Sequence, residues 1–432
     1  MLRDLRVGAF KSYEGEQRLV LAPLTVLIGA NASGKSNLIE ALQLLAWLAR
    51  SHRLGDLGHA LRERELAIRG SASDLLPRGR TDLRLGCKLD TLVLDLQIRV
   101  DGQGARIVAE QLEETEGADS ELPLYTVTQP ALEHGSELRV AYNNYSRGKQ
   151  KPQISCIDSQ AVFTQLLTPA RFDGKHTKSH ERIPEACTRL ADELGGMVFL
   201  DPQPTAMRDY CYLDERELYP NGSNVSAVLW QLMQAEREQE VLEFVRALPE
   251  QNIEAIQFLL GPRNDVMVKL VETFGGQRRE MDAAVLSDGT LRVLAIAAAV
   301  LSVAPGSLVV IEEIDNGVHP SRAMQLMASL HGAAKRRNVQ LLVTTHNPAL
   351  LDAIPPAAIA DTMACYRDPT TGASLLQRLG ELDDFGALAA RGPLGILATS
   401  GTLDRYLKNR RTKEERERQG QRTLELFRSA PE

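Results

Sequence analysis

The segment that most constrains this chain is Gly29-Ala30-Asn31-Ala32-Ser33-Gly34-Lys35-Ser36, which has the spacing G-x-x-x-x-G-K-S. It follows an apolar run at residues 24–28 and precedes a helical pattern at residues 37–50. Glycines at these positions let backbone N–H groups surround phosphates, Lys35 reaches the β- and γ-phosphates, and Ser36 offers a hydroxyl to Mg²⁺. The sequence therefore predicts a phosphate-binding loop at the N-terminus of a helix.

Length and composition limit the classes of protein to consider. The 432 residues exceed the range of about 250–300 residues for one hydrophobic core, which predicts two lobes or a large insertion. No apolar run approaches the roughly 20 residues of a membrane span, so we expect no membrane partner. The five cysteines form no C-x-x-C pair and no signal peptide precedes them, which indicates reduced thiols and a cytoplasmic location. A net charge of −7 argues against nucleic-acid binding by the whole surface, but it leaves a local basic groove open.

The N-terminal part of the chain predicts mostly strands. Residues 2–10 and 17–21 read as strands that lead into the strand before the loop, so we expect the N-terminus to belong to the nucleotide-binding sheet. Apolar and polar residues alternate through 83–100, and further candidate strands lie at 107–112, 122–128 and 138–142. This pattern predicts an antiparallel meander.

The middle of the chain is less periodic. Residues 143–180 read as a loop or partly mobile insertion, followed by helices at 184–194, 224–248 and 251–260 with a strand at 197–200 between the first two. The loop carries a basic cluster that a solvated surface explains better than nucleic-acid binding: Arg171, Lys175, His176, Lys178, His180 and Arg182. No sustained heptads are present, so we expect a compact head without a coiled-coil rod.

The C-terminal part predicts alternating strands and helices. A hairpin at 265–285 is followed by a helix at 291–303 and an apolar strand at 307–311. A helix at 321–337 and a strand at 339–345 continue the order. The charged tail at 403–429 reads as a solvated terminal helix, with docking to a partner as the alternative.

Three further elements supply what nucleotide hydrolysis needs besides phosphate binding. Glu312 and Glu313 end an apolar strand, where one carboxylate can hold Mg²⁺ through water and the other can polarise the attacking water. His346 ends another apolar strand, at the sheet edge where ligands bind in open α/β sheets, and is interpreted as a γ-phosphate sensor. The turn at 286–290 places a hydroxyl and a glycine N–H at the start of a helix.

These motifs, in this order, resemble the ABC-type ATPase head. They are most similar to the prokaryotic AAA-family ATPases related to RecF, to structural-maintenance-of-chromosomes (SMC) heads and to the overcoming-lysogenization-defect nucleases, and the opening Ala9-Phe10-Lys11-Ser12-Tyr13 is similar to the N-terminal strand and turn of that family. The resemblance covers residues 1–50 and 280–400 well and the middle loosely. It implies an α/β head with a mixed phosphate-loop sheet, an antiparallel β lobe and a short helical insertion. The expected division is 1–142 and 265–400 for the two parts of the head, 143–264 for a loop and helical insertion, and 401–432 for a charged helical tail.

The resemblance also implies roles for individual residues. Lys35 binds phosphate, Ser36 and Glu312 hold Mg²⁺, Glu313 is the hydrolytic glutamate and His346 is the switch histidine. Ser287 and Gly289 belong to a signature turn that acts in trans on the ATP of a second head, and Asp315 and His319 lie in the loop between the two heads. The residues expected to contact ATP within one head are Lys11, Asn31, Ala32, Ser33, Gly34, Lys35, Ser36 and Asn37.

The sequence departs from the family pattern at several places. The acidic strand ends in Glu-Glu where Asp-Glu is more frequent, and the signature reads Ser-Asp-Gly-Thr, which disfavours a membrane-transporter subunit. The glutamine that links the two lobes in the family has three candidates here, Gln129, Gln153 and Gln160. The residues after Thr345 lack the acidic constellation of a nuclease domain.

The sequence therefore leaves three hypotheses for function. The first is an ATPase whose heads form a homodimer or higher oligomer around ATP and control a protein effector, a toxin or nuclease, in antiphage defence. The second is a RecF-like DNA repair ATPase that clamps DNA under the control of ATP. The third is a scaffold that binds nucleotide without hydrolysing it.

Overall fold

A central six-stranded sheet contains the strand that leads into the phosphate loop. The computed structural model describes residues 1–115, 123–132, 135–148, 150–245, 252–316, 320–383 and 385–408. The central sheet is parallel except for its last strand, and its order is β10 (Val198–Leu200), β15 (Leu308–Ile311), β16 (Gln340–Thr345), β3 (Leu24–Ile28), β17 (Met363–Arg367) and β18 (Ser374–Arg378). The predicted strands at 24–28, 197–200, 307–311 and 339–345 are confirmed, whereas the sequence reading assigned no strand to 363–378.

Helices cover both faces of the central sheet, as a parallel sheet requires. Leu308 and Val310 of β15 point into one hydrophobic core, and Val309 and Ile311 point into the other. The first core contains α1 (Lys35–Ala49), which confirms the predicted helix at 37–50. Against the second core pack α7 (Asp288–Ser302), α8 (Ala323–Arg337), α9 (Pro348–Asp352), α10 (Pro356–Ile359), α11 (Phe385–Ala389), α12 (Leu394–Thr399) and α13 (Thr402–Lys408). The tail prediction beyond residue 408 lies outside the described residues.

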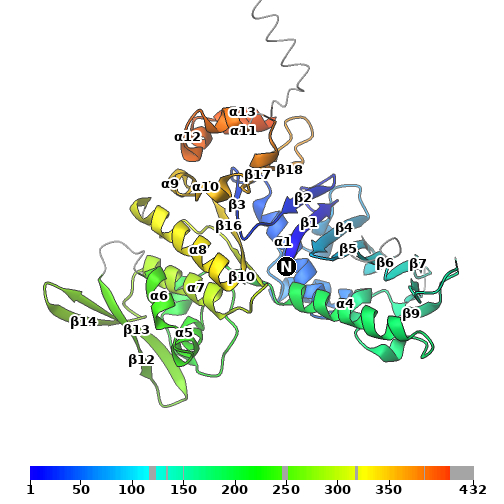
Figure 1. Ribbon diagram of the computed structural model, residues 1–432, viewed down its shortest axis with the longest axis horizontal. Helices are drawn as coiled ribbons and strands as arrows, with labels where there is room; N and C mark the ends of the chain where they lie inside the picture. Colours follow the sequence, from blue (N-terminus) through cyan, green and yellow to red (C-terminus); the bar gives the residue numbers. More distant parts are fainter. Residues whose placement is uncertain are drawn as a thin grey trace, which may run out of the picture.

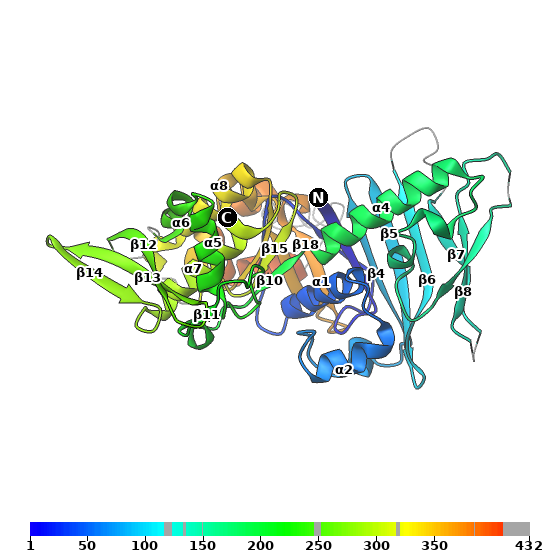
Figure 2. The same ribbon diagram turned by 90° about the horizontal axis from the view of Figure 1, so that it is seen from below.

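An eight-stranded antiparallel sheet forms the lobe at one end of the molecule (Figures 1 and 2). Its order is β2 (Gln17–Val20), β1 (Leu2–Gly8), β4 (Asp82–Leu89), β5 (Leu92–Asp101), β6 (Gly104–Glu114), β7 (Tyr125–Gln129), β8 (Glu137–Tyr142) and β9 (Gln153–Ile157). The predicted meander is confirmed. The helix α2 (Leu57–Arg62) connects α1 to this sheet.

The N-terminal strand does not belong to the nucleotide-binding sheet, so that prediction is wrong. β1 pairs with β2 and β4, both in antiparallel register, and not with β3. The physical reason is visible in its composition, because Arg3, Asp4 and Arg6 place charges among its apolar residues. A strand of the central parallel sheet is buried on both faces and leaves no room for such charges.

Residues 143–180 are not simply a loop, and this expectation is also wrong in part. They contain β9, α3 (Val162–Gln165) and the first turn of α4 (Thr177–Gly195). α4 begins seven residues before the predicted start and carries Pro184 in its interior, while Ile183, Cys187 and Leu190 on its buried face pack into the first core. This burial outweighs the hydrogen bond that the proline removes.

Members of the basic cluster have partners within this lobe. Arg182 bonds to Glu114 at 2.5 Å, and His176 Nδ1 lies 2.9 Å from the Tyr142 hydroxyl. Arg171 donates to the Ser155 carbonyl at 2.5 Å. These contacts favour the structural interpretation of the cluster over a nucleic-acid surface.

A third, four-stranded sheet forms the opposite end of the molecule (Figure 2). It contains β11 (Cys211–Tyr212), β13 (Asp265–Phe274), β12 (Ile253–Leu260) and β14 (Gln277–Asp282), and it packs against α5 (Val225–Gln234) and α6 (Glu238–Val245). The predicted hairpin at 265–285 is confirmed. The predicted helix at 251–260 is wrong, because Ile253–Leu260 pairs along the length of β13 and this ladder overrides the helix-like spacing of its apolar residues.

The predicted single helix at 224–248 is divided in two. α5 ends at Gln234, Glu236 adopts a left-handed φ of 57°, and α6 starts at Glu238. The predicted stop at Pro249 lies outside the described residues. Among the helices of the described ranges, we find none that combines the length and the apolar character needed to cross a membrane.

Candidate functional site

The chemical groups singled out in the sequence meet at one edge of the central sheet. β15, β16 and β3 are neighbours and run in parallel. Their carboxyl ends therefore bring Glu312 and Glu313, His346 and the phosphate loop to the same edge, where ligands bind in open α/β sheets. The strand order thus joins motifs that are more than 270 residues apart in the sequence.

The loop backbone explains why glycine stands at both ends of the motif. Gly29 has φ 152° and Gly34 has φ 120°, conformations that residues with a side chain rarely adopt. A Cβ atom on Gly29 would overlap the Cys365 carbonyl, and one on Gly34 would overlap the Ser374 hydroxyl. The hairpin of β17 and β18 therefore packs directly against the loop and leaves no room for a side chain at either glycine.

This hairpin also bonds to the loop. The Ser33 carbonyl accepts hydrogen bonds from Ser374 Oγ at 2.5 Å and from Cys365 Sγ at 3.3 Å. Arg367 Nε donates to the Ala32 carbonyl at 2.8 Å, which helps to hold Ala32 at its left-handed φ of 63°. These hydrogen bonds hold the backbone of the loop in its observed conformation.

Lys35 and the start of α1 form the anion-binding end of the loop. Lys35 Nζ donates to the carbonyls of Gly29 and Ala30 at 2.6 and 3.1 Å. Burial lowers the pKa of Lys35, and the nearby acidic groups oppose this shift. The N-cap residue Gly34 has no side chain to satisfy the first N–H groups of α1, which leaves them for an anion.

A polar pocket of about 470 Å³ opens in front of the loop. Except for Arg69, Thr344 and Arg367, each residue that lines it was expected from the sequence to contact nucleotide, hold Mg²⁺ or act in hydrolysis. The full lining, here called the phosphate pocket, is Lys11, Asn31, Ala32, Gly34, Lys35, Ser36, Asn37, Arg69, Glu312, Glu313, Thr344 and Arg367. Ser36 and Glu312 bring a hydroxyl and a carboxylate to this pocket, and such oxygen donors suit Mg²⁺ together with substrate phosphates.

Two cations at the pocket share one buried carboxylate. Glu40, whose side chain is 5% exposed, contacts Lys11 Nζ and accepts a bond from Arg69 Nε at 2.7 Å. Lys11 Nζ also donates to the Arg69 carbonyl at 2.7 Å, and Arg69 Nη2 lies 3.3 Å from Asn37 Oδ1. Sequence reading missed Arg69. The available signal was Glu40, an acid in the otherwise apolar segment that follows the loop.

The two glutamates after β15 differ in their surroundings. Burial, assisted by the charge of Asp201, raises the pKa of Glu312 to about 7. Glu313 has a left-handed φ of 47°, which its backbone bond to Thr344 Oγ1 at 2.8 Å helps to hold, and Asn316 Nδ2 donates to Glu313 Oε2 at 2.7 Å. Glu313 therefore combines a strained backbone conformation with a place in the lining of the pocket.

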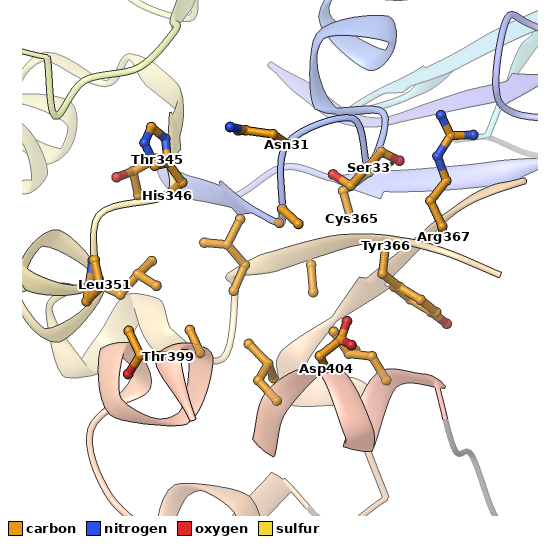
Figure 3. A pocket seen from close by; sticks show the side chains of 18 of the residues that line it. Asn31, Ser33, Thr345, His346, Leu351, Cys365, Tyr366, Arg367, Thr399 and Asp404 are labelled. Carbon is orange, nitrogen blue, oxygen red and sulfur yellow. Dashed lines mark hydrogen bonds between the residues drawn. The ribbon is translucent and has the colours of Figure 1, made fainter. Parts of the chain in front are cut away.

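His346 lies on the other side of the loop. Its Nδ1 is 3.7 Å from Asp315 Oδ2, and the Asp315 side chain is 6% exposed. With Asn31 and Ser33, His346 lines a second cavity of about 570 Å³ that reaches to α12 and α13, as Figure 3 shows. His319 lies outside the described residues.

The signature turn is part of neither cavity. Ser287 caps α7: its Oγ accepts from the Thr290 N–H at 3.2 Å, and the two side-chain hydroxyls are 2.7 Å apart. Neither Ser287 nor Gly289 lines the pocket of its own chain. The structure thus brings the loop, the glutamates and His346 to one edge and leaves the signature turn apart from them.

The three candidate linking glutamines also lie elsewhere. Gln129 is in β7 and Gln153 in β9, both in the antiparallel lobe, and Gln160 Nε2 donates to the Ser51 carbonyl at 3.3 Å. None of the three lines the phosphate pocket.

Comparison with known proteins gives a family. The sequence model of the family described as "AAA domain, putative AbiEii toxin, Type IV TA system" matches residues 24–80 and 172–352, which is more than half of the chain. The DNA replication and repair protein RecF of Synechococcus sp. (strain JA-3-3Ab) is 39% identical over 111 residues, 24% of this chain and 27% of the relative. RecF of Gloeobacter violaceus is 38% identical over 119 residues, 26% of this chain and 28% of the relative. The chain thus spans about a quarter of the length of the curated relatives that it matches.

Solved structures of similar shape are SMC heads. The SMC head domain from Thermotoga maritima is 13% identical with a TM-score of 0.40, covering 87% of this chain and 98% of that chain. The Smc head domain with an extended coiled coil bound to the C-terminal domain of ScpA, derived from Pyrococcus furiosus, is 12% identical with a TM-score of 0.43, covering 87% and 95%. The predicted α/β fold with an antiparallel lobe is confirmed by the order and direction of the strands. The chain belongs to the AAA domain family named above, a family of P-loop ATPases.

Proposed function

We propose that this chain binds ATP with Mg²⁺ in the phosphate pocket and hydrolyses it. The observation that carries the proposal is the convergence of Lys35, Ser36 and the glutamate pair in a single pocket. Lys35 and the first N–H groups of α1 neutralise the β- and γ-phosphates, and Ser36 and Glu312 hold Mg²⁺. Glu313 orients the attacking water and accepts its proton, and His346 senses the γ-phosphate from the other side of the loop.

We further propose that two heads close around ATP as a homodimer or larger assembly. Ser287 and Gly289 are the residues whose role needs a second copy, because they lie outside the pocket of their own chain. A signature turn from the partner head would complete the charge neutralisation around the γ-phosphate. The nucleotide would then act as a dimerisation switch.

We assign control of a protein effector, a toxin or nuclease in antiphage defence, as the purpose of this switch. The description of the family, which names a toxin of a toxin–antitoxin system, supports it. The five free, buried cysteines fit the reducing cytoplasm in which such a system operates. A RecF-like role in DNA repair is the second candidate, and the identity to RecF proteins supports it.

Two variants test the ATPase proposal. Lys35→Ala is expected to abolish nucleotide binding, measured with a fluorescent ATP analogue. Glu313→Gln is expected to bind ATP, to lose hydrolysis and to elute as a dimer with ATP, measured by light scattering. Lys35→Ala/Glu313→Gln is the matched control and should remain a monomer. Hydrolysis at the parental rate by Glu313→Gln would refute the role of this glutamate.

A second experiment separates the two candidate purposes. The Glu313→Gln protein, expressed from its native operon and purified with ATP, is expected to retain a neighbouring gene product. The same purified protein is titrated with duplex DNA at two salt concentrations, with and without ATP. ATP-dependent, salt-sensitive DNA binding without a retained protein would favour the RecF-like role instead.

A further inference from the structure

One arginine holds the segment that leads into the signature turn. Arg208 directly follows a short 3₁₀ turn at Pro204–Met207. Its Nη1 donates to the carbonyls of Leu286 at 2.7 Å and Ala284 at 3.0 Å, with a longer contact to Ala283 at 3.4 Å. Its Nη2 donates to Asp288 Oδ1 at 2.6 Å. A single guanidinium therefore forms hydrogen bonds to the chain on both sides of Ser287.

These contacts fix peptide planes and not only a side chain. Because the carbonyls of Ala284 and Leu286 both face Arg208, the peptide units before Ser287 cannot rotate without losing charge-assisted hydrogen bonds. The orientation of Ser287 Oγ and of the first N–H groups of α7 follows from those planes. The ion pair with Asp288 adds little, since the Asp288 side chain is 68% exposed.

The segment that leads to Arg208 begins beside the glutamate pair of the phosphate pocket. β10 ends at Leu200, whose carbonyl accepts the Glu312 N–H at 3.1 Å. The next residue, Asp201, is influenced by the charges of Arg292 in α7 and of Glu313. Residues 201–208 thus run from the glutamate pair to the signature turn of the same head.

We propose that Arg208 is a positioning residue that sets the signature turn for the nucleotide of a second head, and that residues 201–208 tie this turn to the glutamate pair of its own head. This inference rests on the proposed dimer. Arg208 does not contact nucleotide in its own head, because it is absent from the lining of the phosphate pocket.

Mixing of variants tests the inference on the full-length protein. Arg208→Ala is expected to bind the fluorescent ATP analogue as the parent does and to lose kcat by at least about tenfold, because three charge-assisted bonds to the turn are removed. An equal mixture of Arg208→Ala and Lys35→Ala should regain about a quarter of the parental activity. Random pairing makes half of the dimers mixed, and each mixed dimer joins an intact loop to an intact turn.

Two controls make the result specific. Arg208→Ala mixed with Ser287→Arg should stay inactive, because both defects lie in the same turn. Arg263→Ala, which removes an exposed arginine between β12 and β13, should leave kcat unchanged. Arg208→Lys retains the charge and some of the bonds and should lose less activity than Arg208→Ala, with the same melting temperature as the parent.

The outcomes separate the two proposals. If Ser287→Arg regains activity with Lys35→Ala but Arg208→Ala does not, Arg208 does not act through the turn and the inference is overturned while the dimer stands. If neither mixture regains activity, the composite dimer is refuted and the inference falls with it. If Arg208→Ala keeps the parental kcat, the inference is refuted directly.

Discussion

Two glutamates in different parts of the molecule, the buried Glu110 and the half-buried Glu312, share one property and differ in another. Burial raises the pKa of both Glu110, in the antiparallel lobe, and Glu312, at the phosphate pocket, to about 7. Glu110 accepts bonds from the Tyr125 hydroxyl at 2.6 Å and from the N–H groups of Val162 and Phe163 at 2.7 and 2.8 Å. Within the described part of the chain, we find no hydrogen bond donated to the Glu312 carboxylate.

This difference in hydrogen bonding distinguishes a structural acid from a candidate metal ligand. The carboxylate of Glu110 links the start of α3 to β6 through these hydrogen bonds, so its lone pairs are already occupied by donors of the protein. Glu312 bears a similar desolvation cost but is surrounded by charges, among them Asp201, Arg69 and Glu40, without hydrogen-bond compensation from the protein. A cation such as Mg²⁺ is the partner that would compensate it.

The largest expected effect is on the Glu312 side of this comparison. Glu312→Gln should reduce Mg²⁺-dependent ATP hydrolysis by about a thousandfold, the several kcal/mol that a bound metal contributes to the transition state. Its melting temperature should equal or exceed that of the parent, because a partly buried charge is removed. Steady-state ATPase assays over a Mg²⁺ titration, paired with thermal melts, measure both. A lower melting temperature with parental activity would reverse the assignments of the two glutamates.

The opposite result is expected for Glu110. Glu110→Ala should lower the free energy of unfolding by about 4 kcal/mol at pH 6, because the two N–H groups and the tyrosine hydroxyl lose their acceptor. Activity per folded molecule should be unchanged. Urea unfolding measures the loss, and Glu113→Ala on the same strand is the matched control, since its carboxylate accepts a bond from Gln111 and does not clasp α3. A loss equal to that of the control would show that Glu110 is not a clasp.

The pocket itself could be predicted from the sequence because its parts have strict spacing. Gly29, Gly34 and Lys35 are identified by their pattern, and each neighbouring motif follows an apolar run that can only be a buried strand. Parallel strands then place their carboxyl ends together. By contrast, the assignment of β1 to the wrong sheet ignored Arg3 and Arg6, whose charges disfavour a strand of a parallel sheet that is buried on both faces.

Other features had no local pattern to find. Arg69 and Arg208 reach the pocket and the signature turn from loops that are 32 and 80 residues away from their partners Asn37 and Asp288. The hairpin of β17 and β18 supports the loop through the side chains of Ser374, Cys365 and Arg367, which donate to loop carbonyls and belong to no recognisable motif. β12 was misread because its apolar residues fit a helix as well as a strand until β13 supplied a ladder. Tertiary contacts of this kind decide structure without leaving a periodic signal.

The pH dependence of stability tests the property that the two glutamates share. An acid whose pKa rises from 4.5 to about 7 on folding binds more protons in the folded state between these values. Stability should therefore be highest at the acid end of this window and fall as pH rises through it, by about 3 kcal/mol for each group. Urea unfolding of the parent, Glu110→Gln and Glu312→Gln between pH 4.5 and 8 measures the contribution of each glutamate to the pH dependence of stability. A parent curve no steeper than those of the variants would contradict the raised pKa values.

The smallest expected effect is on the pH dependence of Mg²⁺ affinity, which should involve Glu312 and not Glu110. Metal binding requires the ionised carboxylate, so protons compete with Mg²⁺ at Glu312 below its pKa of about 7. The apparent Mg²⁺ affinity of the nucleotide complex should fall by about fivefold from pH 7 to pH 6 and level off above pH 8. The terminal phosphate also titrates in this range. The change of apparent Mg²⁺ affinity with pH in the parent, minus the same change in Glu312→Gln, therefore gives the contribution of the Glu312 carboxylate. Glu110→Gln should show the same pH dependence as the parent, because Glu110 bonds to the start of α3 and not to the metal. Identical slopes in all three proteins would mean that Glu312 does not bind the metal.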